Sequence, residues 1–326
     1  MLALLGAGLI GLRAADRWLF GSAKQTRGPL VSVTIPAGSG LHEIAGVLEQ
    51  AGVVGSAGDF ELHAFGAADL KAGIYRIRQH ESYEEILAIL RAGPPARPTK
   101  KLVIPEGLAV RDMAQLVPKV GLGGAAYEAV AKKARPPDGF LGADEPAATI
   151  EGFLFPATYD VQQPPTAEEL VAQQLEAFSA TFAKVDLTYA KSRNLTAYDV
   201  LKIASLIERE AAYSGDRAKI AAVIYNRLHA GMTLGIDATI QYAVGAWRPL
   251  KARDLEIDSP FNSRVAKGLP PTPICSPGLA SLEAAAHPSR KRKYLYYVAI
   301  PGDKKRRHFF TDSYAAFLQF QKDHPA

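Results

Sequence analysis

The 326-residue sequence has a single cysteine, Cys275, which excludes an intramolecular disulfide and leaves too few thiols for a structural zinc site. Cys275 lies in a proline-rich stretch without a neighbouring histidine, a poor setting for a catalytic nucleophile. The seven histidines are scattered and never form a His-Glu-x-x-His motif, and no glycine-rich phosphate loop ending in Lys-Ser/Thr is present. The sequence therefore predicts neither a metal site nor any other cofactor.

A large excess of charge of one sign is also missing, since 38 Lys and Arg against 33 Asp and Glu give a formal net charge of only +5. Two short basic runs stand out, at residues 290–293 and 304–307. Such runs could contact nucleic acid, anionic lipid or the carboxylates of cell-wall peptides, but simple solvated charge is the favoured interpretation.

A complete membrane-spanning segment is missing as well. Residues 1–12 are apolar, but Arg13, Asp16 and Arg17 interrupt the run before it reaches the roughly 20 residues that a spanning helix needs. We interpret residues 1–22 as an incomplete membrane anchor, with the apolar core of a signal peptide or a buried helix as alternatives. The basic residues after the run conflict with export, because positive charge normally stays on the cytoplasmic side.

The pattern that is present predicts an α+β fold with two domains. Residues 33–38 (VTIPAG) and 102–107 (LVIPEG) are similar, and each reads as a strand that ends in Pro-x-Gly and leads into apolar residues at helical spacing. Residues 73–77 predict another strand, and a helix from Ser82 to Leu90 is closed by Gly93. We expect a small domain at 30–95, a proline-rich linker at 94–98 and a larger domain at 99–326.

In the larger domain, helices are predicted over residues 167–184 and 216–229, and a hairpin over residues 294–300 and 307–310. Thr196 and Asp199 have the spacing of a capping box, which predicts the start of a further helix. This helix carries residues 204–212 (ASLIEREAA), where two carboxylates stand two positions apart in an otherwise apolar segment.

Residues two apart on a helix do not face each other, so Glu208 and Glu210 are not a paired acid and base. Glu208 stacks on Ala204 beside Leu201, an apolar setting that would remove water from the carboxyl and raise its pKa, as a general acid requires. Glu210 has comparable apolar neighbours, and the pattern alone barely separates the two. Solvated charges on the flanks of an amphipathic helix are the plainer alternative.

Five stretches together resemble the YceG-like endolytic murein transglycosylases. They are residues 151–156 (EGFLFP), 204–210 (ASLIERE), 223–228 (VIYNRL), 231–234 (GMTL) with Asp237 and Thr239, and 268–274 (GLPPTPI). Their order and spacing also agree with that family. The resemblance covers the chain from about residue 30 to its end and implies a LysM-like domain, a catalytic transglycosylase domain and a membrane anchor.

The resemblance implies that Glu208 is the catalytic acid. Further candidates for holding the glycan, as hydrogen-bonding or stacking groups, are Glu151, Asn226, Asp237, Gln241, Asn262, Phe155 and Tyr159. The amides and Asp237 are as readily explained as capping or turn residues, and the aromatic rings as core. The family usually has Ser-Pro-Tyr-Asn-Thr-Tyr where residues 259–264 read SPFNSR, and an aspartate where Ala157 stands. These departures, with Thr272 and Cys275, concern substrate subsites rather than the type of reaction.

The activity implied is cleavage of the MurNAc-GlcNAc β-1,4 bond within nascent peptidoglycan strands to leave 1,6-anhydroMurNAc ends. The implied location is the inner membrane, crossed once, with the catalytic domain in the periplasm and peptidoglycan synthases (penicillin-binding proteins) as possible partners. A non-catalytic peptidoglycan-binding scaffold is the main alternative. A basic nucleic-acid-binding protein is disfavoured by the apolar N-terminus and the LysM-like region, so no nucleic-acid partner is expected.

Overall fold

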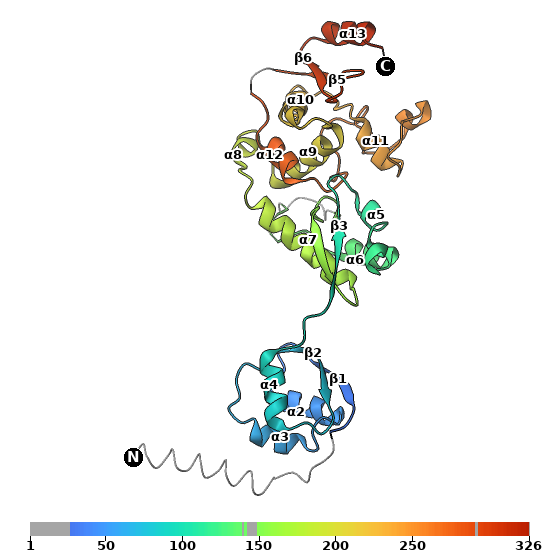
Figure 1. The fold of residues 1–326 in the computed structure, drawn as a ribbon. Coiled ribbons are helices and arrows are strands. Elements are labelled where there is room, and N and C mark those ends of the chain that lie inside the picture. Colours follow the sequence, from blue (N-terminus) through green and yellow to red (C-terminus); the bar gives the residue numbers. More distant parts are fainter. Residues whose placement is uncertain (1–26, 139, 142–148, 291–292, 326) are drawn as a thin grey trace. The chain divides into compact units, whose positions relative to one another are not determined.

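The computed structural model describes residues 27–138, 140–141, 149–290 and 293–325 (Figure 1). Contacts divide the chain between Arg97 and Pro98 into two compact units, each with its own buried cluster. Helices and short antiparallel sheets occur in both units, which confirms the predicted α+β class. Among the described residues no helix is long and apolar enough to cross a bilayer, and the predicted anchor at 1–22 lies outside them.

The first unit packs three helices on one two-stranded sheet. In chain order its elements are β1 (Leu30–Ile35), α2 (Leu41–Gln50), α3 (Ala57–His63), β2 (Gly73–Arg78) and α4 (Tyr83–Ala92). Strands β1 and β2 are antiparallel, with Val33 opposite Tyr75. Ser82 caps α4 by accepting a hydrogen bond from the Glu85 amide, as the sequence pattern predicts. Helix α3 was not predicted from the sequence.

The second unit begins with β3 (Thr99–Val103), which pairs antiparallel with β4 (Thr158–Gln162). Between them lie α5 (Val110–Met113), the 3-10 helix η1 (Val117–Val120) and α6 (Gly124–Lys133). The apolar spacing after residue 107 predicts one helix, but the structure has two short turns. Pro118 explains the break, because its ring cannot enter a helix interior without loss of a hydrogen bond.

The helical part of this unit follows β4. Its elements are α7 (Ala167–Phe182), α8 (Thr188–Ser192), α9 (Ala197–Glu210), η2 (Ser214–Asp216), α10 (Arg217–His229), α11 (Asp237–Ala243), η3 (Ala252–Glu256) and α12 (Leu279–Ala286). Helices α7 and α10 agree with the predicted ranges to within two residues. The chain ends in the predicted hairpin, β5 (Tyr296–Ala299) with β6 (His308–Thr311), followed by α13 (Tyr314–Asp323).

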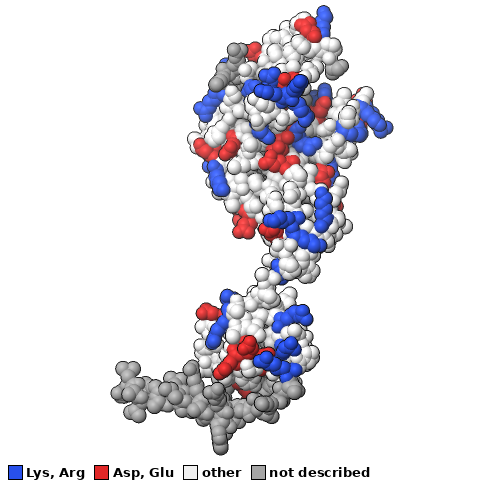
Figure 2. Space-filling model, viewed as in Figure 1, with Lys and Arg blue, Asp and Glu red and all other residues white. Residues whose placement is uncertain are grey.

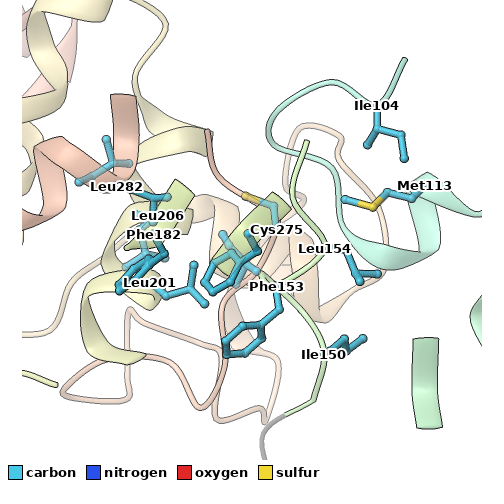
Figure 3. Close-up of a cluster of buried hydrophobic side chains, with 14 of the residues drawn as sticks. Ile104, Met113, Ile150, Phe153, Leu154, Phe182, Leu201, Leu206, Cys275 and Leu282 are labelled. Atoms are coloured by element: carbon cyan, nitrogen blue, oxygen red, sulfur yellow. The ribbon is translucent and has the colours of Figure 1, made fainter. Parts of the chain in front are cut away.

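The core of the second unit surrounds α9, which packs against α10, α11 and α12. Figure 3 shows side chains from several segments gathered in this core, among them Leu201 and Leu206 of α9, Phe182 of α7, Leu282 of α12, and Phe153, Leu154 and Cys275 from loops. Cys275 is fully buried, and burial raises its pKa well above that of a free thiol. An inert core thiol is therefore what the structure shows at this position.

Candidate active site

Helix α9 is the element that carries the two glutamates. Thr196 and Asp199 form the predicted capping box at its N-terminus, with hydrogen bonds of 3.1 and 3.0 Å in the two directions. The helix is amphipathic, as its sequence pattern indicates. Residues 203–207 are buried, whereas Asp199, Lys202 and the three charged residues of the last turn are partly exposed. The C-terminal carboxylates therefore lie at the border of the core.

The last turn of α9 sends three consecutive side chains to three different segments. Glu208 is partly exposed, and its Oε2 accepts a hydrogen bond of 3.1 Å from the amide of Gly278, the residue that caps the N-terminus of α12. The amide and the helix dipole of α12 both stabilise negative charge on the Glu208 carboxylate. A carboxyl that is fixed by one oxygen and still reachable from solvent can exchange a proton with a bound substrate.

A loop at residues 274–278 fixes the position of Gly278. On one side it is bound to α9, since the Ile274 amide donates to Ser205 Oγ at 3.1 Å. On the other side Ser276 exchanges two hydrogen bonds of 2.9 Å with the turn that follows β3, one from Gly107 and one to Leu108. The loop is therefore held between α9 and the β3 turn, so both the donor and the acceptor of the Glu208 hydrogen bond are fixed in position.

The β3 turn brings a further carboxylate, Glu106, to Glu208. Gly107 adopts a φ of +80° in this turn, a conformation that favours glycine, and a Cβ at that position would lie 3.5 Å from Glu208 Cγ. A Cβ on Gly278 would overlap the Glu106 carboxylate, so that carboxylate occupies the space beside the same residue whose amide binds Glu208. Partial burial and then the charge of Glu208 raise the pKa of Glu106, whereas Arg217 lowers it.

Arg209, the second side chain of this turn, joins the β3 turn to an aromatic cluster. Its Nη1 donates to the Gly107 carbonyl at 3.1 Å, and its guanidinium lies 3.7 Å from the centre of the Trp247 ring. The Trp247 indole in turn donates to Asp112 at 2.7 Å. These contacts hold the wall of the site next to Glu208 without using its carboxylate.

Glu210, the third side chain, faces away from Glu208 and toward the C-terminal hairpin. Its Oε2 accepts a hydrogen bond of 2.9 Å from the hydroxyl of Tyr297 on β5. Burial raises the pKa of Glu210, the charge of Asp237 adds to this rise, and the Tyr297 hydrogen bond opposes it. Asp237 itself accepts two hydrogen bonds from Arg264, at 3.0 and 2.6 Å. The two glutamates thus belong to two separate groups of side chains.

Of the other predicted site residues, Glu151 is a buried carboxyl. Only 6% of its surface is exposed, and both oxygens accept from the Val110 amide while Tyr242 donates to Oε2 at 3.2 Å. Burial raises its pKa to about 7. The adjacent Gly152 has a φ of +89°, and a Cβ there would lie 2.6 Å from Pro273. This stretch therefore packs against the loop that leads to Gly278.

The remaining candidates are bound mostly to backbone. Asn226 donates to the Tyr294 carbonyl at 2.9 Å and Gln241 to the Arg248 carbonyl at 2.7 Å. The buried Asn262 donates to two carbonyls of the preceding loop, and the Tyr159 hydroxyl donates to the carbonyl of Phe155 at 2.6 Å. Contacts of this kind shape loops and core, and their roles toward a substrate remain predictions.

The structure adds Glu106, Arg209, Tyr297 and Gly278 to the side chains and backbone groups around the two glutamates. A sequence signal for Glu106 existed in the internal repeat, where the residue between Pro and Gly is Ala37 in the first copy and Glu106 in the second. A charged residue at a position where the other copy has alanine indicates a role that is specific to the second copy. Gly278 and Tyr297 give no comparable signal, because only the folded chain places them beside α9.

The arrangement suits proton transfer. In the part of the chain that the structure describes, no three His, Cys, Asp or Glu side chains are grouped so as to hold a metal ion. The partly exposed carboxyl of Glu208 can donate a proton to an ether oxygen and later take one from a hydroxyl. A second carboxylate, Glu106, is near enough to influence that exchange through its charge.

Comparison with known proteins agrees with the motifs. Residues 33–323 match the YceG-like family. The endolytic murein transglycosylase of Bacillus subtilis strain 168 is 32% identical over 289 residues, which cover 82% of this chain and 78% of that protein. The endolytic murein transglycosylase of Streptococcus pneumoniae strain D39 is 36% identical over 299 residues, covering 82% of this chain but 54% of that protein.

The chain thus spans about half the length of the pneumococcal relative that it matches. A crystal structure of a yceG-like protein from Listeria monocytogenes has a TM-score of 0.59 and 29% identity, and covers 90% of this chain and 99% of the other. Sequence and fold therefore agree over both units. The chain belongs to the YceG-like family.

Proposed function

We propose that this protein is an endolytic murein transglycosylase, a lyase that cleaves the MurNAc-GlcNAc β-1,4 bond within peptidoglycan glycan strands and leaves 1,6-anhydroMurNAc ends. The observation that carries the proposal is the partly exposed carboxyl of Glu208, held by the Gly278 amide at the end of a buried helix. The names of the relatives from Bacillus subtilis and Streptococcus pneumoniae support the same activity.

A single carboxyl is sufficient for this reaction. Protonated Glu208 gives its proton to the glycosidic oxygen, and the bond between that oxygen and the MurNAc anomeric carbon breaks. The resulting carboxylate then takes the proton of the MurNAc C6 hydroxyl, while the oxygen of that hydroxyl bonds to the same anomeric carbon. The ring closes, Glu208 regains its proton and no water is consumed. Because the attacking hydroxyl belongs to the same sugar, its effective concentration is high.

The test is to replace each glutamate of α9 by glutamine, which keeps the shape of the side chain but cannot exchange the proton. We expect Glu208→Gln to lose on the order of 10²–10⁴ in cleavage rate or more. Glu210→Gln should retain most activity, because Glu210 is bound to Tyr297 and faces the hairpin. The assay counts anhydromuramic ends by mass spectrometry after incubation with uncross-linked strands, and circular dichroism verifies folding.

The opposite result, an inactive Glu210→Gln with an active Glu208→Gln, would assign catalysis to the other glutamate. Retained activity in both variants would refute catalysis at this helix. If no variant, the parent included, forms anhydromuramic ends while all of them bind glycan, the protein is the non-catalytic scaffold instead.

For the first unit we infer a LysM-like glycan-binding role. Two helices between two antiparallel strands support this proposal, as does a surface depression beside the turn from β1 to α2. Ser39, His42, Glu43 and Gln50 line that depression and offer hydrogen-bonding groups suited to sugar hydroxyls and acetamido groups. Binding of soluble glycan strands to this unit, abolished by substitution of these residues, is the expected result.

We further propose that the chain is tethered to the inner membrane by a single segment, with both units in the periplasm near peptidoglycan synthases. The support is the substrate, which lies outside the cytoplasm, and the apolar run at residues 1–12. External protease added to spheroplasts should digest both units, and full protection would refute the proposal. A nucleic-acid-binding role finds no support in Figure 2, where basic and acidic side chains are interspersed on the visible face of the second unit.

A further inference from the structure

The geometry around Gly278 points to a role for Glu106. We propose that Glu106 is a positioning residue for catalysis, whose carboxylate works with that of Glu208 as a pair that keeps one proton available for the glycosidic oxygen. The inference rests on the proposed transglycosylase function and goes beyond it, because a one-carboxyl mechanism assigns no task to a second acid.

The first argument is that both carboxylates meet at one residue. The Gly278 amide donates to Glu208, and the Glu106 carboxylate fills the space where a side chain on residue 278 would stand. Gly278 has a φ of −80°, which any residue can adopt, so its backbone conformation does not require glycine. The lack of a side chain there serves to admit Glu106.

The second argument is that Glu106 is held in place by backbone contacts on two sides. Its turn exchanges hydrogen bonds with Ser276 and accepts one from Arg209 through the Gly107 carbonyl. These bonds do not involve the Glu106 side chain, so the carboxylate is positioned by the turn yet remains free to interact with its neighbour. A surface turn without a function has no need of anchors from both α9 and the 274–278 loop.

The third argument concerns the balance of charge. The Glu208 carboxylate lies beside the Gly278 amide, and the charge of Glu208 raises the pKa of Glu106. Two like charges at close range disfavour a second ionisation. Arg217 and Arg209 are the cations that face this group, from α10 and α9. The pair therefore releases its last proton at a higher pH than one carboxyl alone would.

The experiment is the pH dependence of kcat/KM for the full-length protein on uncross-linked peptidoglycan strands, read as anhydromuramic ends. In Glu106→Gln the high-pH limb of the profile should move to lower pH by about one unit, whereas the plateau at lower pH changes less than about threefold. One unit above the midpoint of the parent limb, the variant should therefore be about tenfold slower than the parent.

Two further variants make the test independent of a single substitution. Gly278→Ala retains both carboxylates but displaces Glu106, so its limb should move in the same direction. Glu106→Asp keeps the charge at shorter reach and should restore part of the shift. The matched control is Glu283→Gln, which removes an exposed carboxylate from the same helix α12 and should leave the profile in place.

A limb that stays in place in both Glu106→Gln and Gly278→Ala would overturn the proposal, even if the rate falls uniformly, because a merely structural residue lowers activity without changing its pH dependence. An equal shift in Glu283→Gln would also overturn it, by showing a general charge effect. A parent protein that forms no anhydromuramic ends would refute the proposed function itself, and the role of Glu106 with it.

Discussion

At the scale of single residues, Glu151 is the most unusual group outside the proposed pair of Glu106 and Glu208. It is a buried carboxyl whose pKa is raised to about 7 by loss of water, although the Val110 amide and Tyr242 donate to it. In the unfolded chain a glutamate has a pKa of about 4.3. At a pH between these two pKa values, Glu151 holds a proton in the folded form that it has released in the unfolded form.

Folding stability should therefore fall as pH rises from about 4.5 to about 7, because the unfolded state binds fewer protons in that window. The full effect is on the order of 3 kcal/mol. Urea unfolding of the parent and of Glu151→Gln at pH 5 and pH 8 measures it, and the parent should lose more stability than the variant. Glu128→Gln, an exposed position on α6, is the control, and an identical pH dependence in parent and Glu151→Gln would contradict the prediction.

The sequence pattern reduced the candidates for the catalytic acid to two glutamates, Glu208 and Glu210, but could not separate them. Both have apolar neighbours on α9, and what distinguishes them lies elsewhere in the chain: Gly278 beside Glu208 and Tyr297 beside Glu210. Family resemblance chose Glu208, and its exposure and contacts support that choice. Local periodicity cannot supply such information, because each partner is remote in sequence.

At the scale of elements, periodicity predicted the larger pieces well. Helices α7, α9 and α10 and the β5–β6 hairpin lie where apolar spacing, capping residues and turns place them. One error has a local cause: a single helix was predicted after residue 107, where Pro118 divides it. Another has a tertiary cause. Helix α3 was not predicted, because a short segment with one fully buried residue, Phe60, gives little hydrophobic period to detect.

The C-terminal hairpin is attached to the helical core through Asp216, which is fully buried. Its carboxylate accepts from the His308 amide at 2.7 Å and pairs with Lys219 at 2.6 Å. Burial alone would raise the pKa of Asp216, but the hydrogen bonds from Lys219 and His308 outweigh it and lower the pKa below its usual range. A lowered folded pKa means that stability is present above about pH 4 and is lost as pH falls further.

We accordingly expect Asp216→Asn to reduce the free energy of unfolding by about 2 kcal/mol at pH 7, because the ammonium of Lys219 loses its partner. Near pH 2.5 the difference between parent and variant should become smaller. Denaturant titration at the two pH values measures both effects. Asp312→Asn, which alters an exposed residue just beyond β6, should change stability by less than about 0.5 kcal/mol, and an equal loss there would contradict a specific role for Asp216.

At the scale of the whole molecule, the two units divide binding from cleavage in the proposed function. Every residue around Glu208 belongs to the second unit, whose core cluster contains no residue from the first. A chain beginning at Pro98 keeps β3 complete, including the bond from the Gln163 amide to the Pro98 carbonyl. It should fold alone and cleave soluble strands, but with a higher KM than the full chain.

The measurement is kcat and KM for both chains on strands of several lengths, with circular dichroism as the check on folding. We expect kcat to change less than about threefold and KM to rise most for long strands, which can reach both units. A folded but inactive short chain would show that the first unit takes part in cleavage. An unchanged KM would show that it does not grip the glycan.

The hydrogen bonds that assemble the site also determine when it can exist. Glu208 depends on an amide 70 positions later in the chain, and Arg209 on a carbonyl 102 positions earlier. Closing such long loops is slow and comes late in folding. A chain that is still emerging or only partly collapsed has its glutamate but not its partners. The proposed lyase would therefore acquire its activity only as the final long-range contacts close.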